Sequence, residues 1–274
     1  MYILLALSVA LFGIGYYQTR VLRDPDGPTI TMEGESFTVS VGDKDESLLR
    51  GIHAQDRKDG DVTSSLVIQG LSNFVEKGRR QATIAAFDSD NNVTKVTREI
   101  RYSDYVSPRF SLEHPLSFPI GTQESQIVGA IHVQDCLDGD LSGEVTVELE
   151  DQDAWLDTSL EGTICLVYTV VNSAGDVAEL PVTVQIYQNS QYSRATQLQL
   201  SSNLVYLERG ASFDPWSYVS GMEKGGEKIP LNRQLVKVSD PVDTSTPGVY
   251  EVLYTVTEED SENVTRLRLP VIVE

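Results

Sequence analysis

Short runs in which apolar and polar residues alternate make up most of this chain. These runs are rich in Val, Thr, Ile and Tyr, and Gly, Asn, Asp and Pro separate them. Alternation with a period of two is typical of strands that bury one face, and turns every ~8–12 residues are typical of β-sandwiches. The pattern therefore predicts an all-β fold. Its clearest strands are expected at 37–41, 82–87, 145–149, 165–171, 180–187, 249–256 and 267–273.

One phrase occurs twice along the chain. IHAQDRKDGDVTS, residues 52–64, returns 79 residues later as IHVQDCLDGDLSG. A Gly-led strand, a polar turn and a closing strand follow each copy, and the same sequence of features closes the chain once more. A period of this length indicates repeated modules. We expect three, at 27–104, 105–190 and 194–274, and because each ends close to where the next begins, we expect them to lie end to end.

The order of these features resembles the bacterial immunoglobulin-like domain, a family first named from insecticidal crystal toxins and common in surface proteins of Gram-positive bacteria. The resemblance implies three tandem immunoglobulin-like β-sandwiches, a building block attached to many activities. The first module departs from the pattern with Ile84 at the family Tyr position, and the third lacks the Asp-rich phrase. The second module matches most completely, through Asp135, Asp138, Gly139, Asp140, Gly162, Tyr168, Thr169, Val170, Asn172, Gly175 and Asp176.

The N-terminal segment is a candidate membrane element. Residues 2–17 carry no charge and end in a Tyr pair. As a helix they would reach ~24 Å, short of a ~30 Å hydrocarbon core, so the span is marginal. We expect residues 1–19 to be a signal anchor or a cleaved signal peptide, and 20–26 to be a linker. The expected location is the cell membrane, with a single N-terminal span and the bulk of the chain extracellular.

The charge balance narrows the choice of partners. The chain has 41 acidic and 21 basic residues and a net charge of −20. Nucleic-acid binding depends on clustered Lys and Arg, so no nucleic-acid partner is expected. An acidic surface suits solubility or the recruitment of cations.

The repeated aspartates allow two interpretations. Asp-Gly is a strong turn former, and an Asp side chain caps nearby backbone amides, so the phrase is explained by architecture alone. Clustered carboxylates are also the ligands that Ca²⁺ prefers, although the spacing is not that of an EF-hand. The candidate calcium ligands are Asp56, Asp59 and Asp61 in the first copy, with Asp135, Asp138 and Asp140 in the second. His53 and His132, inside the two copies, are expected to face solvent or the sheet edge.

The two cysteines, Cys136 and Cys165, both fall in the second module. They could form a disulfide in an oxidising compartment, or they could be two separate thiols. The spacing does not decide between these alternatives.

No catalytic motif is present, and the residues predict a non-catalytic protein. Phosphate-binding glycine loops, nucleophile elbows and zinc-helix signatures do not occur. Trp155 and Trp216 are either core residues or exposed platforms on which a sugar ring stacks. We therefore expect a membrane-tethered cell-surface spacer, adhesion or protein-interaction module. The alternatives are a carbohydrate-binding accessory module that binds a surface glycan, and a structural component of an envelope assembly.

Overall fold

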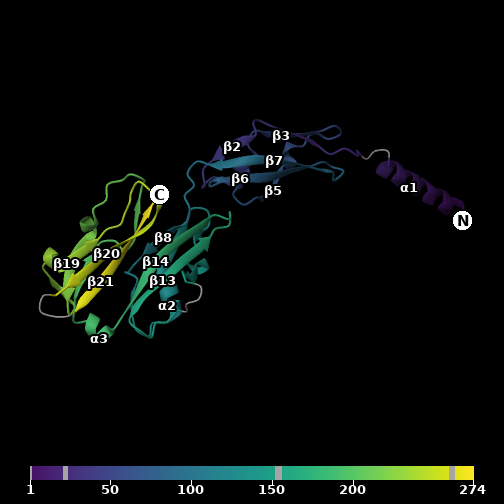
Figure 1. Cartoon of the computed structure of the whole chain (residues 1–274). Helices are drawn as coiled ribbons and strands as arrows, with labels where there is room; N and C mark the ends of the chain where they lie inside the picture. The colour runs from purple at the N-terminus through teal and green to yellow at the C-terminus, as the bar shows by residue number, and fades with distance from the viewer. Residues whose placement is uncertain (1, 21–23, 152–155, 259–262) are drawn as a thin grey trace. The chain divides into compact units, whose positions relative to one another are not determined.

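The computed structural model describes residues 2–20, 24–151, 156–258 and 263–274. The chain divides into two compact units, Met1–Val106 and Ser107–Glu274 (Figure 1). The first unit holds the N-terminal helix and the first module. The second unit holds the second and third modules.

The N-terminal helix, α1, runs from Tyr2 to Arg20. Its uncharged residues favour a helix, and the apolar side chains described along it are exposed on all sides, from Leu5 to Tyr17. Among the described residues, no helix is long and apolar enough to cross a membrane. The predicted membrane span is therefore not supported. Polar residues from Gln18 onward end the apolar segment before it reaches the thickness of a bilayer.

The first module is a sandwich of a three-stranded and a four-stranded sheet, ordered β1-β3-β4 and β2-β7-β6-β5. Alternate residues of β3 are buried, with Ile52, Ala54 and Asp56 facing inward, as period-two patterning predicts. The elements of this module are β1 (Thr29–Met32), β2 (Ser36–Val39), η1 (Asp45–Leu49), β3 (Ile52–Asp56), β4 (Gly60–Asp61), η2 (Thr63–Ser65), β5 (Val67–Leu71), β6 (Arg79–Phe87) and β7 (Val93–Tyr102).

The second module repeats this arrangement, with sheets ordered β11-β10-β8 and β12-β13-β14-β9. The long hairpin β13–β14 supplies much of its core, and β9 adds to the edge of β14 in parallel over three residue pairs. Its elements are β8 (Arg109–Leu112), β9 (Ser117–Pro119), α2 (Glu124–Val128), β10 (Ile131–Asp135), β11 (Gly139–Asp140), η3 (Ser142–Glu144), β12 (Thr146–Leu149), β13 (Gly162–Val171) and β14 (Val177–Tyr187).

A short helix, α3 (Asn189–Tyr192), leads into the third module, whose sheets are ordered β15-β17-β18 and β16-β21-β20-β19. The elements are β15 (Thr196–Leu200), β16 (Val205–Leu207), η4 (Pro215–Tyr218), β17 (Val219–Lys224), β18 (Glu227–Ile229), η5 (Arg233–Leu235), β19 (Val236–Ser239), β20 (Gly248–Thr257) and β21 (Val264–Val273). The predicted all-β class is confirmed, and each predicted strand overlaps a strand of the structure. The module boundaries themselves stay a prediction.

A buried tyrosine closes the core of the second and third modules. The hydroxyl of Tyr168 donates to the Ile127 carbonyl at 2.9 Å, and that of Tyr254 donates to the Pro215 carbonyl at 2.7 Å. Burial raises the pKa of both phenols, so both stay neutral donors. Each bond satisfies a backbone acceptor on the segment that connects the two sheets.

In the first module a different residue binds the corresponding backbone carbonyl. Ile84 replaces the tyrosine, and the carbonyl that corresponds to that of Ile127 belongs to Leu48. Arg98, only 1% exposed, donates to the carbonyls of Leu48 and Arg50 at 3.3 and 2.7 Å. Its guanidinium also lies 4.2 Å from the centre of the Phe37 ring. An arginine therefore substitutes for the missing hydroxyl in this core.

The third module folds back along the second. Glu274, at the end of the chain, forms a 2.5 Å ion pair with Arg109, the first residue of β8. Arg109 lies beside Gln134 of β10, at the opposite end of the second module from the point where the chain leaves β14. Figure 1 shows β20 and β21 alongside β14. The expected end-to-end arrangement is therefore wrong for these two modules.

Candidate functional site

The first aspartate of each repeated phrase caps the turn that follows it. Asp56 is buried at the end of β3, and its Oδ1 accepts from the amides of Lys58 and Asp59, both at 2.8 Å. Asp135 makes the corresponding bonds in the second module, to the amides of residues 137 and 138 at 2.8 and 2.9 Å. These contacts are those of an Asx turn.

The second aspartate joins two loops. Asp59 accepts from the amide and hydroxyl of Ser89, both at 2.8 Å, and Ser89 lies in the turn between β6 and β7. Asp138 binds Ser173 in the same way, at 2.6 Å for both bonds. The bonds from the Ser89 amide and hydroxyl lower the pKa of Asp59, because they favour the ionised carboxyl. The phrase is therefore tied to the hairpin turn of its own module.

The third aspartate orders the start of the next segment. Hydrogen bonds from the hydroxyl and amide of Thr63 lower the pKa of Asp61, and the bonds from Ser142 do the same for Asp140. The same hydroxyls accept bonds from backbone amides of β3 and β10, from Ala54 at 3.1 Å and from residue 133 at 3.0 Å. The aspartates of both copies thus have structural partners.

These bonds support the turn interpretation without testing the metal interpretation. Within the part of the chain that the structure describes, no group of three or more His, Cys, Asp and Glu side chains is arranged to hold a metal ion. Calcium binding by the phrases stays a prediction. The imidazoles of His53 and His132 are exposed, as expected, on the outer face of their strands.

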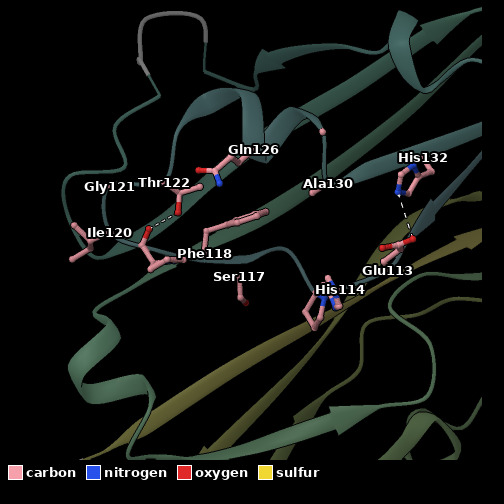
Figure 2. A pocket seen from close by; sticks show the side chains of 13 residues that line it. Glu113, His114, Ser117, Phe118, Ile120, Gly121, Thr122, Gln126, Ala130 and His132 are labelled. Atoms are coloured by element: carbon pink, nitrogen blue, oxygen red, sulfur yellow. Dashed lines mark hydrogen bonds and ion pairs between the residues drawn. The ribbon is translucent and has the colours of Figure 1, made fainter.

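A groove that sequence reasoning missed lies beside β9 in the second module. It has a volume of about 650 Å³. Figure 2 shows Phe118 between Gln126 and Thr122 on one side and Ser117 and His114 on the other. At one end His132 Nε2 lies 3.9 Å from the Glu113 carboxylate. A phenyl ring flanked by an amide, a hydroxyl and imidazoles suits a small ligand of mixed polarity.

The groove has no sequence signature, because it depends on the point at which β8 and β10 of the second module separate. In the first module β1 and β3 stay paired one step further, since the Glu33 amide donates to the Gly51 carbonyl at 2.9 Å. The matching residues of the second module are Glu113 and Ala130. Their backbones make no such bond among the described residues, and both line the groove.

Both cysteines are thiols in the structure, and a disulfide between them in an oxidising compartment stays a prediction. Cys165 lies on β13, on the solvent-facing side of its sheet, since its neighbour Leu166 points into the core. Cys136 lies in the turn between β10 and β11, which belong to the other sheet of the sandwich. The two side chains therefore belong to different layers.

The two tryptophans have different outcomes. Trp155 lies outside the described residues. Trp216 is half-buried in η4, packs against the core of the third module, and has the Arg233 guanidinium 4.6 Å from its ring centre. Arg233 therefore covers one face of this ring.

Part of the chain is similar to a known family. Residues 200–273 match the family described as bacterial surface protein, Ig-like domain. The predicted resemblance is thus confirmed over the third module, whereas three copies are not. The pesticidal crystal protein Cry22Aa of Bacillus thuringiensis is 32% identical over 133 residues, which are 47% of this chain and 16% of that protein. The chain thus spans about a sixth of the length of this relative.

Solved structures resemble the chain only loosely. The CBM51-2 and INT domains of Clostridium perfringens ZmpB share 19% identity over 56% of this chain and 26% of theirs, with a TM-score of 0.23. The protocadherin GammaB4 extracellular domain shares 14% over 92% and 50%, with a TM-score of 0.20. The lipoprotein BT2262 of Bacteroides thetaiotaomicron shares 12% over 89% and 98%, with a TM-score of 0.21. Scores this low support no conclusion about function.

Proposed function

We propose that this chain is a non-catalytic module of a bacterial cell surface, used for spacing, adhesion or interaction with another protein. The observation that carries the proposal is the match of residues 200–273 to a surface immunoglobulin-like family. Open sheet edges and exposed loops are the surfaces on which such sandwiches bind partners. A role as a structural component of an envelope assembly would use the same surfaces.

Surface location is tested by labelling intact cells. The full chain with a C-terminal epitope tag is produced in a Gram-positive host, and antibody binding is compared before and after lysis. Labelling of intact cells is expected. Labelling that requires lysis would overturn the proposal.

Attachment to lipid through α1 is a separate part of the proposal. The exposed apolar side chains of this helix, with Leu7 and Leu11 among them, support it. The full chain is expected to float with phosphatidylglycerol vesicles in a density gradient, and a Leu7→Asp/Leu11→Asp variant is expected to remain at the bottom. Equal flotation of both proteins would assign the attachment to another part of the chain.

Binding of a surface glycan is the second candidate function. The groove beside Phe118 is a better candidate site for it than Trp216, because Arg233 covers one face of the Trp216 ring. The probe is chitotetraose, followed by amide shifts in a ¹⁵N NMR titration. Shifts at groove residues that a Phe118→Ala variant abolishes and a Trp216→Ala variant retains would support this alternative. The reverse pattern would move the site to Trp216, and no shift at 10 mM would count against binding of this glycan.

A further inference from the structure

Two sheet edges of the second module, at β8 and β14, lie next to the third module. β8 is the last strand of the sheet β11-β10-β8. On the other sheet, β9 covers β14 only from residue 185 to residue 187, so no described strand pairs with the preceding part of β14 on that side. Open edges expose unpaired backbone groups, and folded proteins usually cover them.

Side chains of the third module bind both edges. At β8, the Phe110 amide donates to the Tyr206 hydroxyl at 2.8 Å. At β14, the Glu251 carboxylate accepts from the amide and the hydroxyl of Thr183, at 2.8 and 2.6 Å. Because backbone groups of one module are satisfied by side chains of the other, separation of the two modules would leave them unpaired.

Apolar and charged contacts continue the interface. Leu204, Val249 and Ile272 of the third module pack against the core of the second. The Arg109 guanidinium lies 4.6 Å from the centre of the Tyr206 ring, next to its ion pair with Glu274. Both charged side chains are more than 40% exposed, so the ion pair itself contributes little. The apolar residues and the edge bonds provide most of the cohesion.

The same interface borders the groove. Asn203 of the third module donates from Nδ2 to the Glu113 carbonyl at 2.8 Å and to that of Leu112 at 3.4 Å. These carbonyls lie where β8 separates from β10. In the first module, the corresponding residue Glu33 instead continues the ladder to Gly51. Asn203 thus engages the strand whose departure opens the groove.

We propose that the third module is the intramolecular partner of the open edges of the second, that the two unfold as one unit, and that their contact keeps the groove open. The folded-back pair is then a compact block with a fixed binding face. This inference goes beyond the proposed surface role and is tested on the purified chain, so failure of the surface-labelling experiment would leave it standing.

The test is amide hydrogen exchange of the full chain, resolved by residue. In a Glu251→Ala variant, which removes both acceptor oxygens, exchange at Thr183 is expected to accelerate at least tenfold, together with exchange across the core strands of the second module. A Glu227→Ala variant is the matched control, because it removes the same charged side chain from an exposed position on β18, away from the interface. Tyr206→Phe, which removes one hydroxyl, is expected to accelerate exchange at Phe110.

Hydrogen exchange at the Glu113 amide tests whether the contact with the third module keeps the groove open. In an Asn203→Ala variant, the Glu113 amide is expected to become protected, because it can then pair with Ala130 as Glu33 does with Gly51. Acceleration confined to the third module in the Glu251 variant, or unchanged exchange at Thr183, would overturn the single unit. Unchanged exchange at Glu113 would overturn the role of Asn203.

Discussion

In the first module, Arg98 replaces the tyrosine-to-carbonyl bond of the other two modules by different chemistry. Its position on β7 corresponds to that of Val182 on β14, which is buried and apolar. The guanidinium binds the Leu48 carbonyl, which corresponds to the Ile127 carbonyl that Tyr168 binds in the second module. Burial lowers the pKa of Arg98 from its ordinary value. The cost of burying this charge is offset by bonds to backbone carbonyls and by the Phe37 ring.

If Arg98 compensates for the missing tyrosine, the effects of substitutions at positions 98 and 84 on the free energy of unfolding should depend on each other. Arg98→Val is expected to lower the free energy of unfolding by about 2–3 kcal/mol, because it leaves buried carbonyls unpaired. Adding Ile84→Tyr rebuilds the arrangement of the second module, and the double variant is expected to recover at least about 1 kcal/mol of this loss. Urea unfolding measures both. A double variant no more stable than Arg98→Val alone would show that the two cores are not interchangeable.

The repeated aspartates lead to a second prediction. Asp138→Ala removes both bonds to Ser173, so it is expected to lower the melting temperature and to speed exchange in the β13–β14 turn. Glu148→Ala, which removes an exposed carboxylate of β12 outside the phrase, serves as the control for loss of charge.

Calcium separates the two interpretations of the phrase. We expect millimolar calcium to leave the melting temperature unchanged, because the carboxylates already accept structural bonds. Binding of about two ions in calorimetry, with a higher melting temperature that Asp59→Ala plus Asp138→Ala abolishes, would establish a calcium site instead.

At the scale of elements, the joint between the second and third modules is a tyrosine stack. Tyr187, at the end of β14, and Tyr192, in α3, have ring centres 3.8 Å apart. Burial, with the neighbouring Tyr187 and Glu223 charges adding to it, raises the pKa of Tyr192 to about 12. The folded state therefore favours the neutral phenol more than the unfolded state does.

The sign of the pH dependence follows from this shift. The stabilisation from Tyr192 is present below about pH 10, the unfolded pKa of tyrosine, and is lost as the pH rises toward 12. Urea midpoints measured between pH 9 and 11.5 are expected to fall less steeply in a Tyr192→Phe variant than in the parent chain. Identical slopes would mean that Tyr192 ionises equally easily in both states.

At the scale of the whole molecule, a net charge of −20 coexists with many carboxylates that are held ionised. Hydrogen bonds from Ser or Thr residues are the first cause of a lowered pKa at Asp59, Asp61, Asp104, Asp140, Asp157 and Asp243. Since their folded pKa values lie below the unfolded ones, the stabilisation is present above about pH 4 and is lost as the pH falls further.

Acid unfolding is therefore expected to begin below about pH 4, with a nearly constant melting temperature between pH 5 and 8. Differential scanning calorimetry across this range measures it. Ser142→Ala, which removes the hydroxyl that binds Asp140, is expected to weaken the acid dependence. A stability that rises on acidification would mean instead that repulsion among the 41 acidic residues outweighs these bonds.

The sequence by itself determined the strands, the repeat and the turns. Period-two burial sets the strands, because one face of each must leave water. Asp-Gly chemistry is local, so the bonds of Asp56 and Asp61 within their loops follow from spacing alone. The bond between Asp59 and Ser89 could not be predicted from the sequence, since it joins residues that are distant along the chain.

Only the tertiary structure decided how segments that are distant in sequence pack against one another. The fold-back of the third module, the layers that separate Cys136 from Cys165, and the groove beside Phe118 depend on contacts between distant segments. Such contacts have no local period or motif, because any exposed Asn, Tyr or Glu can bind a backbone group that the fold brings near it. Asn203, Tyr206 and Glu251 acquired their roles in this way.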